Sequence, residues 1–228
     1  MTYIPPLSDN APRPRLPREL DPVEVRILGS LMEKQMATPE YYPLTLNALV
    51  AATNQKSNRE PVMELSESEA QRALDRLQDE KLVWKVMGGR AVRWDHNLDH
   101  VWHLNRGEKA LITLLFLRGP QTAGEMRGRS DRLHSFESVQ EVEDVLRDMA
   151  AHSEPLVRAL PRRPGQKEER WAHLAGGAVI DTAPVSFESE SGSAPASEPL
   201  SARVTRLETQ VAELTSALNA LKEKLGET

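Results

Sequence analysis

The sequence predicts a mainly helical α+β protein with two tandem winged-helix domains and a C-terminal coiled-coil helix. A pattern of three short helices and a β-hairpin occurs twice, and its landmarks are offset by 72 to 77 residues, as between Ala73 and Val145 or Trp94 and Trp171. Three helices followed by a two-stranded wing are the winged-helix form of the helix-turn-helix. Ser/Thr-x-x-Glu capping patterns at three predicted helix starts support the same count of helices.

Residues 20–103 form the first predicted domain, after a proline-rich lead-in at residues 1–19 that we expect to be disordered. Asp21 can cap the first helix, because it precedes Pro22 and an apolar stripe at helical spacing. A second short helix is predicted at residues 45–53. Ser66, with Glu69 three residues later, begins the third helix, and a two-stranded wing follows it.

Residues 104–176 form the second predicted domain. Its first helix starts near Asn105 and ends at residues 119–120, a Gly-Pro pair. Thr122 and Ser138 each stand three residues before a glutamate, so they are predicted to cap the second and third helices. The third helix is expected to end near His152.

Two further segments follow. Residues 177–200 are rich in Ser, Ala, Glu and Pro, which is typical of a flexible linker. Residues 201–226 carry apolar side chains that alternate by three and four, as the a and d positions of a coiled coil do. The seam consists of Val204, Leu207, Val211, Leu214, Leu218, Leu221 and Leu225. It predicts a homodimer; the alternative is an amphipathic helix that docks on its own domain.

Composition bounds the class of protein. The chain has no cysteine, which excludes disulfides, thiolate metal sites and cysteine nucleophiles. No stretch approaches the ~18 apolar residues of a membrane span, so we expect a cytoplasmic protein. Residues 1–180 carry 25 basic and 26 acidic side chains. The predicted domains are therefore nearly neutral, whereas a DNA-binding domain is often basic.

Four stretches together carry a resemblance to a known family: LDPVEVRIL at residues 20–28, YPLTLNAL at 42–49, NQKSNREP at 54–61 and LRGPQTAGE at 117–125. On these, the chain resembles the YceH-like family of uncharacterised bacterial proteins with tandem winged-helix domains, over roughly residues 20–175. The resemblance implies the fold and a bacterial cytosolic setting. It implies no activity, so function has to be argued from the side chains.

The outward faces of both third helices are acidic. Carboxylates lowered into a DNA groove would be repelled by phosphate, so standard docking of the second of these helices is not expected. The third helix of the first domain carries Glu67, Glu69, Asp75, Asp79 and Glu80 against Arg72, Arg76 and Lys81. The third helix of the second domain carries Glu141, Glu143, Asp144 and Asp148 against Arg147.

Basic and amide side chains lie instead in the turn before the first third helix and on the two wings. They could contact phosphates, and the turn amides could read adenine. The candidate nucleic-acid-binding residues are Lys56, Asn58, Arg59, Arg90, Arg93, Arg158, Arg162, Arg163 and Lys167. The alternative is that these are solvated surface charges.

The sequence therefore predicts a non-catalytic protein, a DNA-associated transcriptional regulator that contacts duplex DNA through its turn and wings. The alternative function is a protein–protein interaction scaffold with no direct DNA binding. We expect no enzyme activity and no cofactor, because no nucleophile elbow or glycine-rich phosphate loop is present.

A cluster of histidines and carboxylates follows the first wing. Imidazole and carboxylate groups suit zinc or nickel, but this stretch must also join the two domains. We therefore expect hydrogen-bonded structural histidines and no metal site. The cluster comprises Asp95, His96, Asp99, His100 and His103. Trp84, Trp94, Trp102 and Trp171 are expected to complete the wing and hinge core.

Overall fold

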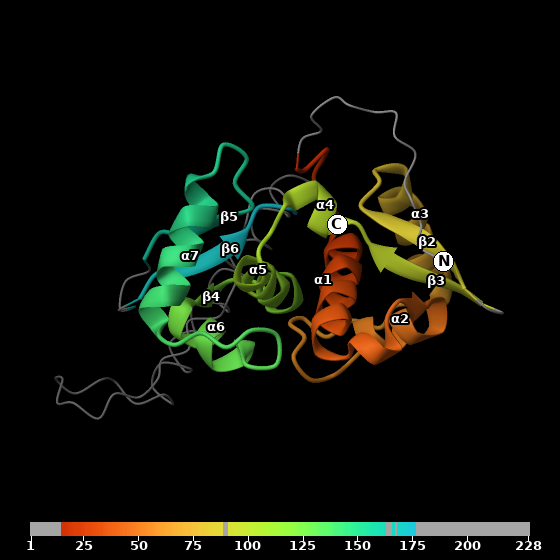
Figure 1. The fold of residues 1–228 in the computed structure, drawn as a ribbon, viewed down its shortest axis with the longest axis horizontal. Helices are drawn as coiled ribbons and strands as arrows, with labels where there is room; N and C mark the ends of the chain where they lie inside the picture. Colours follow the sequence, from red (N-terminus) through yellow and green to blue (C-terminus); the bar gives the residue numbers. More distant parts are fainter. Residues whose placement is uncertain (1–14, 89–90, 163–165, 167, 177–228) are drawn as a thin grey trace, which may run out of the picture. The chain divides into compact units, whose positions relative to one another are not determined.

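A computed structural model describes residues 15–88, 91–162, 166 and 168–176 of the chain (Figure 1). The coiled-coil seam, the linker at residues 177–200 and most of the lead-in lie outside the described residues, as do Arg90, Arg163 and Lys167. The described part is a mixed α+β protein with seven α-helices and two antiparallel three-stranded sheets, which confirms the α+β class. None of these helices is long and apolar enough to cross a membrane.

The first half runs from α1 to β3. Its elements are α1 (Pro22–Ala37), the 3₁₀ helix η1 (Pro39–Tyr41), β1 (Leu44–Thr45), α2 (Leu46–Thr53), α3 (Glu67–Asp79), β2 (Val83–Gly88) and β3 (Ala91–His96). The short helix α4 (Leu98–Trp102) leads out of it. We name β2 and β3 the first hairpin. The sheet order is β1-β3-β2, so β2 is an edge strand.

The second half repeats the order of elements. It contains α5 (Arg106–Arg118), β4 (Gln121–Thr122), α6 (Ala123–Ser130), α7 (Val139–Ala151), β5 (Val157–Leu160) and β6 (Arg170–His173). We name β5 and β6 the second hairpin. The sheet order is β4-β6-β5, which matches the first half strand for strand.

The predicted helix starts are observed. Asp21, Ser66 and Thr122 each accept a hydrogen bond from the backbone amide three residues on, and the carboxylate of the glutamate there accepts one from the backbone amide of the cap residue. Ser138 also caps α7, but the carboxylate of Glu141 accepts from the amide of Glu137 instead of that of Ser138. These local bonds satisfy amides that have no partner inside the helix.

Two short strands were not predicted. Each precedes the second helix of its half and pairs with the last strand of the hairpin: Leu44 lies opposite Trp94, and Gln121 lies opposite Trp171. A two-residue strand has no periodicity of its own, because its position is fixed by the distant strand with which it pairs. The predicted two-stranded wings are therefore parts of three-stranded sheets.

The two halves share one core. Helix α1 packs along α5, and the two lie side by side in Figure 1. A Cβ atom at Gly29 would lie 2.9 Å from Cβ of Phe116, so the close approach of the helices depends on a glycine there. Residues 24–32 of α1 are all buried, not only the predicted apolar stripe, because α1 lies between its own half and α5.

The last five residues of the predicted disordered lead-in make defined contacts. Nη2 of Arg15 donates to the Trp102 carbonyl at 2.6 Å, and the Trp102 indole donates to the Arg15 carbonyl at 2.6 Å. The amide of Leu20 then donates to the carbonyl of Ala175 at 2.7 Å. Residues 15–20 thus connect the start of the first half with the end of the second.

Candidate interaction surfaces

The turn before α3 buries the arginine that the sequence offered to phosphate. Both terminal nitrogens of Arg59 donate to the carboxylate of Glu33, at 3.1 and 2.5 Å, and its side chain has no exposed surface. Its Nε and Nη2 also donate to the carbonyl of Ala52, near the end of α2. A helix C-terminus and a carboxylate both favour a cation. Arg59 was predicted to contact nucleic acid through an exposed side chain; its side chain is instead buried, and its donors bind groups inside the protein.

A second buried arginine was missed. Arg26 is 2% exposed, and it donates to the carbonyls of Thr53, Pro61 and Leu117, at 3.4, 2.7 and 3.4 Å. Burial, followed by the positive charge of Arg59, lowers the pKa of Arg26 to about 10. The amide of Glu60 also donates to the carbonyl of Leu117. The turn is thereby tied to the ends of both α2 and α5.

Other candidates in the turn remain accessible. Lys56 and Asn58 are exposed, and Asn58 has a φ of 59°, a left-handed conformation that asparagine tolerates. The turn therefore presents one cation and one amide to solvent, where the sequence had suggested a larger polar and basic group.

The last strand of each hairpin carries an arginine with a structural role. Arg93 donates to the carbonyl of Pro43 at 2.7 Å, and Arg170 donates to the carbonyl of Pro120. Each proline lies two residues before the threonine that caps the next helix, and both pairs follow the repeat. Arg93 thus fastens β3 to the start of α2, a role that the sequence analysis did not assign to it. The sequence could have indicated this role, because Pro-x-Thr and Arg-Trp occur at corresponding positions of both halves.

The two described basic candidates of the second hairpin differ in whether they form an ion pair. Arg158 is exposed, while Nε of Arg162 lies 3.5 Å from Oε1 of Glu169. Arg162 is 61% exposed, so this ion pair is solvent-screened and weak. The structure does not bring the described candidates into one continuous basic surface.

The outward face of α7 is acidic, as the sequence indicated. Its one arginine, Arg147, donates to Glu143 at 2.5 Å and to Asp144 at 2.8 Å. Asp148 is exposed and has no ionic partner among the described residues. A phosphate backbone approaching α7 would therefore meet repulsion that no free cation offsets.

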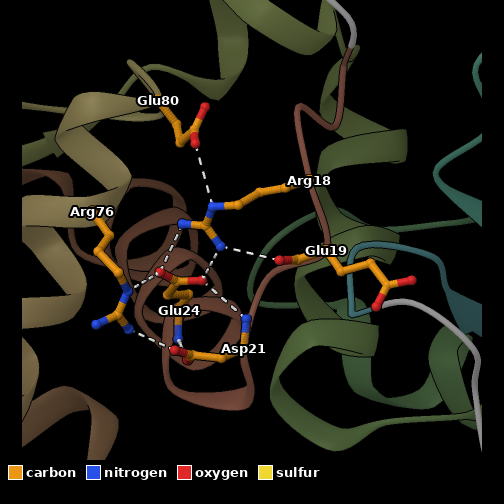
Figure 2. Close-up of polar contacts among 6 residues, drawn as sticks. All are labelled: Arg18, Glu19, Asp21, Glu24, Arg76 and Glu80. Carbon is orange, nitrogen blue, oxygen red and sulfur yellow. Dashed lines mark hydrogen bonds and ion pairs between the residues drawn. The ribbon is translucent and has the colours of Figure 1, made fainter.

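The start of α1 holds an ion network that the sequence did not reveal (Figure 2). Glu24 is fully buried, and it accepts from Arg18 at 2.8 and 2.9 Å and from Arg76 at 2.7 Å. Arg18 also reaches Glu80, and Arg76 reaches Asp21. Burial raises the pKa of Glu24, but the bonds from Arg18, the Asp21 amide and Arg76 outweigh it and lower that pKa to about 2. Arg76 and Glu80 of the acidic α3 region are thereby used within the fold.

The junction after the first hairpin is a hydrogen-bonded structural cluster. Nδ1 of His96 accepts from the amide of Leu98, so its Nε2 donates to Oε1 of Gln35 at 2.9 Å. Lys109 of α5 also donates to Gln35 and, at 2.7 and 2.8 Å, to Asp99. Among the described residues, no histidines and carboxylates are grouped so as to hold a metal ion.

Three of the four tryptophans lie in the core, as expected. Trp94, Trp102 and Trp171 are buried, and Trp102 packs edge-on against Phe116 of α5. Trp102 belongs to the short helix α4. Trp84 is partly exposed and packs against His100.

Two surface features remain after these contacts. On the first hairpin, Met87 is 80% exposed and lies opposite Val92, which is 41% exposed. Beside the second hairpin, a cavity of about 180 Å³ is lined by Ala123, Glu143, Arg147, Arg162, Glu168, Glu169 and Trp171. Neither feature was recognised from the sequence, because each depends on how strands and helices meet in space.

These observations define a mixed α+β protein whose two halves repeat one order of elements. Comparison with known proteins gives the family. Residues 20–166 match the family model described as "Protein of unknown function, DUF480", and the chain belongs to this family. The resemblance to YceH-like proteins is consistent with that membership.

Relatives cover nearly the whole chain. A UPF0502 protein of Burkholderia orbicola (strain MC0-3) is 45% identical over 223 residues, which span 96% of this chain and 94% of the relative. UPF0502 proteins of Acidovorax sp. (strain JS42) and Chromobacterium violaceum (strain ATCC 12472) are each 44% identical over 220 residues. These alignments span 92% and 91% of this chain, and 95% and 93% of the relatives.

Proposed function

We propose that this chain is a non-catalytic protein with two tandem winged helices that acts as a scaffold for protein partners. The winged-helix assignment is supported by the order of elements in each half, a helix, a short strand, two helices and a hairpin. The sheet orders β1-β3-β2 and β4-β6-β5 support it further.

The observation that carries the scaffold function is the exposed apolar pair of Met87 and Val92. On the same face of the first hairpin, the pair Val83 and His96 is buried and Lys85 lies over the Trp94 ring. This face of the hairpin is therefore buried near Val83, and the apolar pair of Met87 and Val92 extends it beyond the core. Phosphates offer such side chains no favourable contact, whereas a protein partner buries them at about 25 cal/mol per Å².

The second hairpin shows that the repeat does not require this pair. In the second hairpin, Ala159 lies opposite Trp171. The positions that correspond to Met87 and Val92 come two residues nearer the end of the hairpin, and they are Pro161 and Glu169. Only the first hairpin therefore carries the apolar pair among the described residues, which favours a specific use over a demand of the fold.

A photo-crosslinking experiment tests the scaffold. Benzoylphenylalanine placed at Met87 in the full chain, expressed in its native host, should give a discrete crosslinked protein. The matched control is the same group at Gly128, an exposed position in α6 with no neighbour within 4 Å of an added Cβ. No crosslinked protein at Met87, or the same products at both positions, would contradict the scaffold.

The second candidate function is DNA association through the turn and hairpins, which the exposed side chains of Lys56 and Arg158 favour. A salt series on duplex DNA distinguishes the two functions. For DNA binding, the log–log slope is about −0.9 per phosphate neutralised, and Lys56→Ala with Arg158→Ala should make it shallower. For the scaffold we expect no measurable binding even at low salt.

A further inference from the structure

We infer that the surface formed by α7 and the second hairpin binds a basic segment of a partner protein, and that one lysine or arginine side chain of that segment enters the cavity beside Trp171. The inference rests on the proposed scaffold function and adds the chemistry of a partner. We name this surface, made of the outward side of α7 and the cavity, the α7 surface.

The volume of the cavity indicates what kind of group can occupy it. Sites for small molecules and cofactors usually enclose about 300–1,000 Å³. The cavity has about 180 Å³, which suits one long side chain rather than a cofactor. It opens between the start of α6, the middle of α7 and the second hairpin, so its occupant can extend from a polypeptide lying along α7.

The excess of carboxylates on the α7 surface favours a positively charged partner. Among the described residues that line the cavity, Glu143, Glu168 and Glu169 outnumber Arg147 and Arg162, and α7 adds the exposed carboxylates of Asp144 and Asp148. Both arginines are already engaged, Arg147 with Glu143 and Asp144, and Arg162 with Glu169. In the described part of the chain, Glu168 and Asp148 have no hydrogen-bonding or ionic partner. Two carboxylates thus remain for an incoming basic segment.

The wall of the cavity suits the same group. Trp171 is 6% exposed and lines the cavity, so a cation that enters can also approach an aromatic ring. Oε2 of Glu168 lies 3.7 Å from where a Cβ of Gly124 would be, which places this carboxylate against the start of α6. A lysine or arginine side chain would meet a ring and a carboxylate together.

The first half lacks this arrangement. The outward side of α3 carries Asp75, which accepts from Gln71 at 2.7 Å and lies 3.9 Å from Nζ of Lys85. Arg72 is exposed on the same helix. Charges of both signs are exposed there, so the preference for a basic partner belongs to the α7 surface.

A binding experiment with matched charge changes tests the inference. The probe is a fluorescein-labelled peptide that alternates arginine and serine, and it is titrated into the full chain with anisotropy as the readout. Asp148→Lys with Glu168→Lys removes the two unpaired carboxylates and leaves the internal ion pairs intact. The control, Glu64→Lys with Asp79→Lys, makes the same change in net charge on exposed residues of the first half.

We expect the first double variant to lower the affinity for the peptide about tenfold and the control to change it less than about twofold. In 5-fluorotryptophan-labelled protein, the ¹⁹F resonance of Trp171, assigned with Trp171→Phe, should shift on titration. Equal losses in both double variants would mean non-specific charge attraction and would overturn the inference. A Trp171 resonance that does not move would also overturn it. Crosslinking at Met87 is independent of the α7 surface, so the scaffold function can stand if this inference fails.

Discussion

At the scale of single residues, His96 and His173 are held neutral inside the protein. Burial, and for His96 also the charge of Lys109, lowers their pKa values to about 3 and about 4. Since an unfolded histidine titrates near 6.5, unfolding takes up protons below that pH. The stability that the neutral histidines contribute is complete above about pH 6.5 and is lost as the pH falls towards the folded values.

We therefore predict that the free energy of unfolding falls from pH 6.5 downwards, by up to about 1.4 kcal/mol per pH unit for each histidine. The variant His96→Gln should show a shallower fall, because one of the two titrating groups is absent. Urea denaturation from about pH 7.5 to about pH 5 measures this. His152→Gln, at an exposed position, is the control and should retain the wild-type slope. A His96→Gln slope equal to that of the control would refute the prediction.

The buried arginine of the turn gives a second prediction at this scale. Arg59→Ala leaves the carboxylate of Glu33, which is 15% exposed, with Lys34, 3.4 Å away, in place of two bonds from a buried guanidinium, and it should cost about 3 kcal/mol of stability. Relief of the repulsion with Arg26 offsets part of that cost. Urea denaturation should show the loss, whereas Lys56→Ala, at the exposed end of the same turn, should change stability by less than about 0.5 kcal/mol. Similar small effects for both variants would mean that the Arg59–Glu33 pair does not stabilise the turn.

At the scale of elements, local chemistry determined what the sequence could predict. Helix starts at Asp21, Ser66 and Thr122 follow from bonds three residues apart, so they can be read directly. The strands β1 and β4 could not be read, because each is defined by its pairing with a strand about 50 residues later. The burial of the turn could not be read for the same reason: the carbonyl of Leu117, 91 residues from Arg26, takes part in it.

The crossing of α1 and α5 provides a prediction with an internal control. Gly→Ala inside a helix normally stabilises by about 1 kcal/mol. At Gly29 the new methyl group would lie 2.9 Å from Cβ of Phe116 and 3.0 Å from Cδ2 of Leu117, so the helices must separate. We expect Gly29→Ala to destabilise by about 1–3 kcal/mol, as overpacking does. Gly128→Ala in α6 meets nothing within 4 Å and should stabilise. Thermal unfolding of the two variants measures the loss of stability expected for Gly29→Ala and the gain expected for Gly128→Ala. A gain of stability in Gly29→Ala would contradict the close packing.

At the scale of the whole molecule, residues 15–20 connect the two halves through Arg15 and Leu20, and Arg18 of the same segment takes part in an ion network at the start of α1. Glu24 receives Arg18 from this segment and Arg76 from α3, so one buried carboxylate joins three parts of the chain (Figure 2). Glu24→Gln should cost about 3 kcal/mol, because both arginines lose their common partner. The folded pKa of Glu24 is about 2, against 4.5 for a free glutamate, so the wild type loses this contribution as the pH falls from about 4.5 to 2. Denaturation at pH 7 and near pH 2.5 should show the difference between wild type and variant shrinking with acid; a constant difference would refute the assigned pKa.

The seam from Val204 to Leu225 gives the last prediction, which concerns assembly. Seven apolar residues alternate by three and four there, and a strict a/d seam is typical of a coiled coil rather than of a helix docked on a domain. The contacts described for the helical core lie within residues 15–176, and the bond from the amide of Leu20 to the carbonyl of Ala175 joins the two ends of that range. We therefore expect deletion of residues 200–228 to lower the molar mass in light scattering at tens of micromolar from a dimer to a monomer. The thermal unfolding of the helical core should stay unchanged, because the contacts described for it lie within residues 15–176. Replacing Leu214 and Leu218 by aspartate in the full-length chain should have the same effect on mass, since charges at adjacent seam positions repel across a parallel pair of helices. An unchanged mass in both variants would favour a helix that folds back on its own chain.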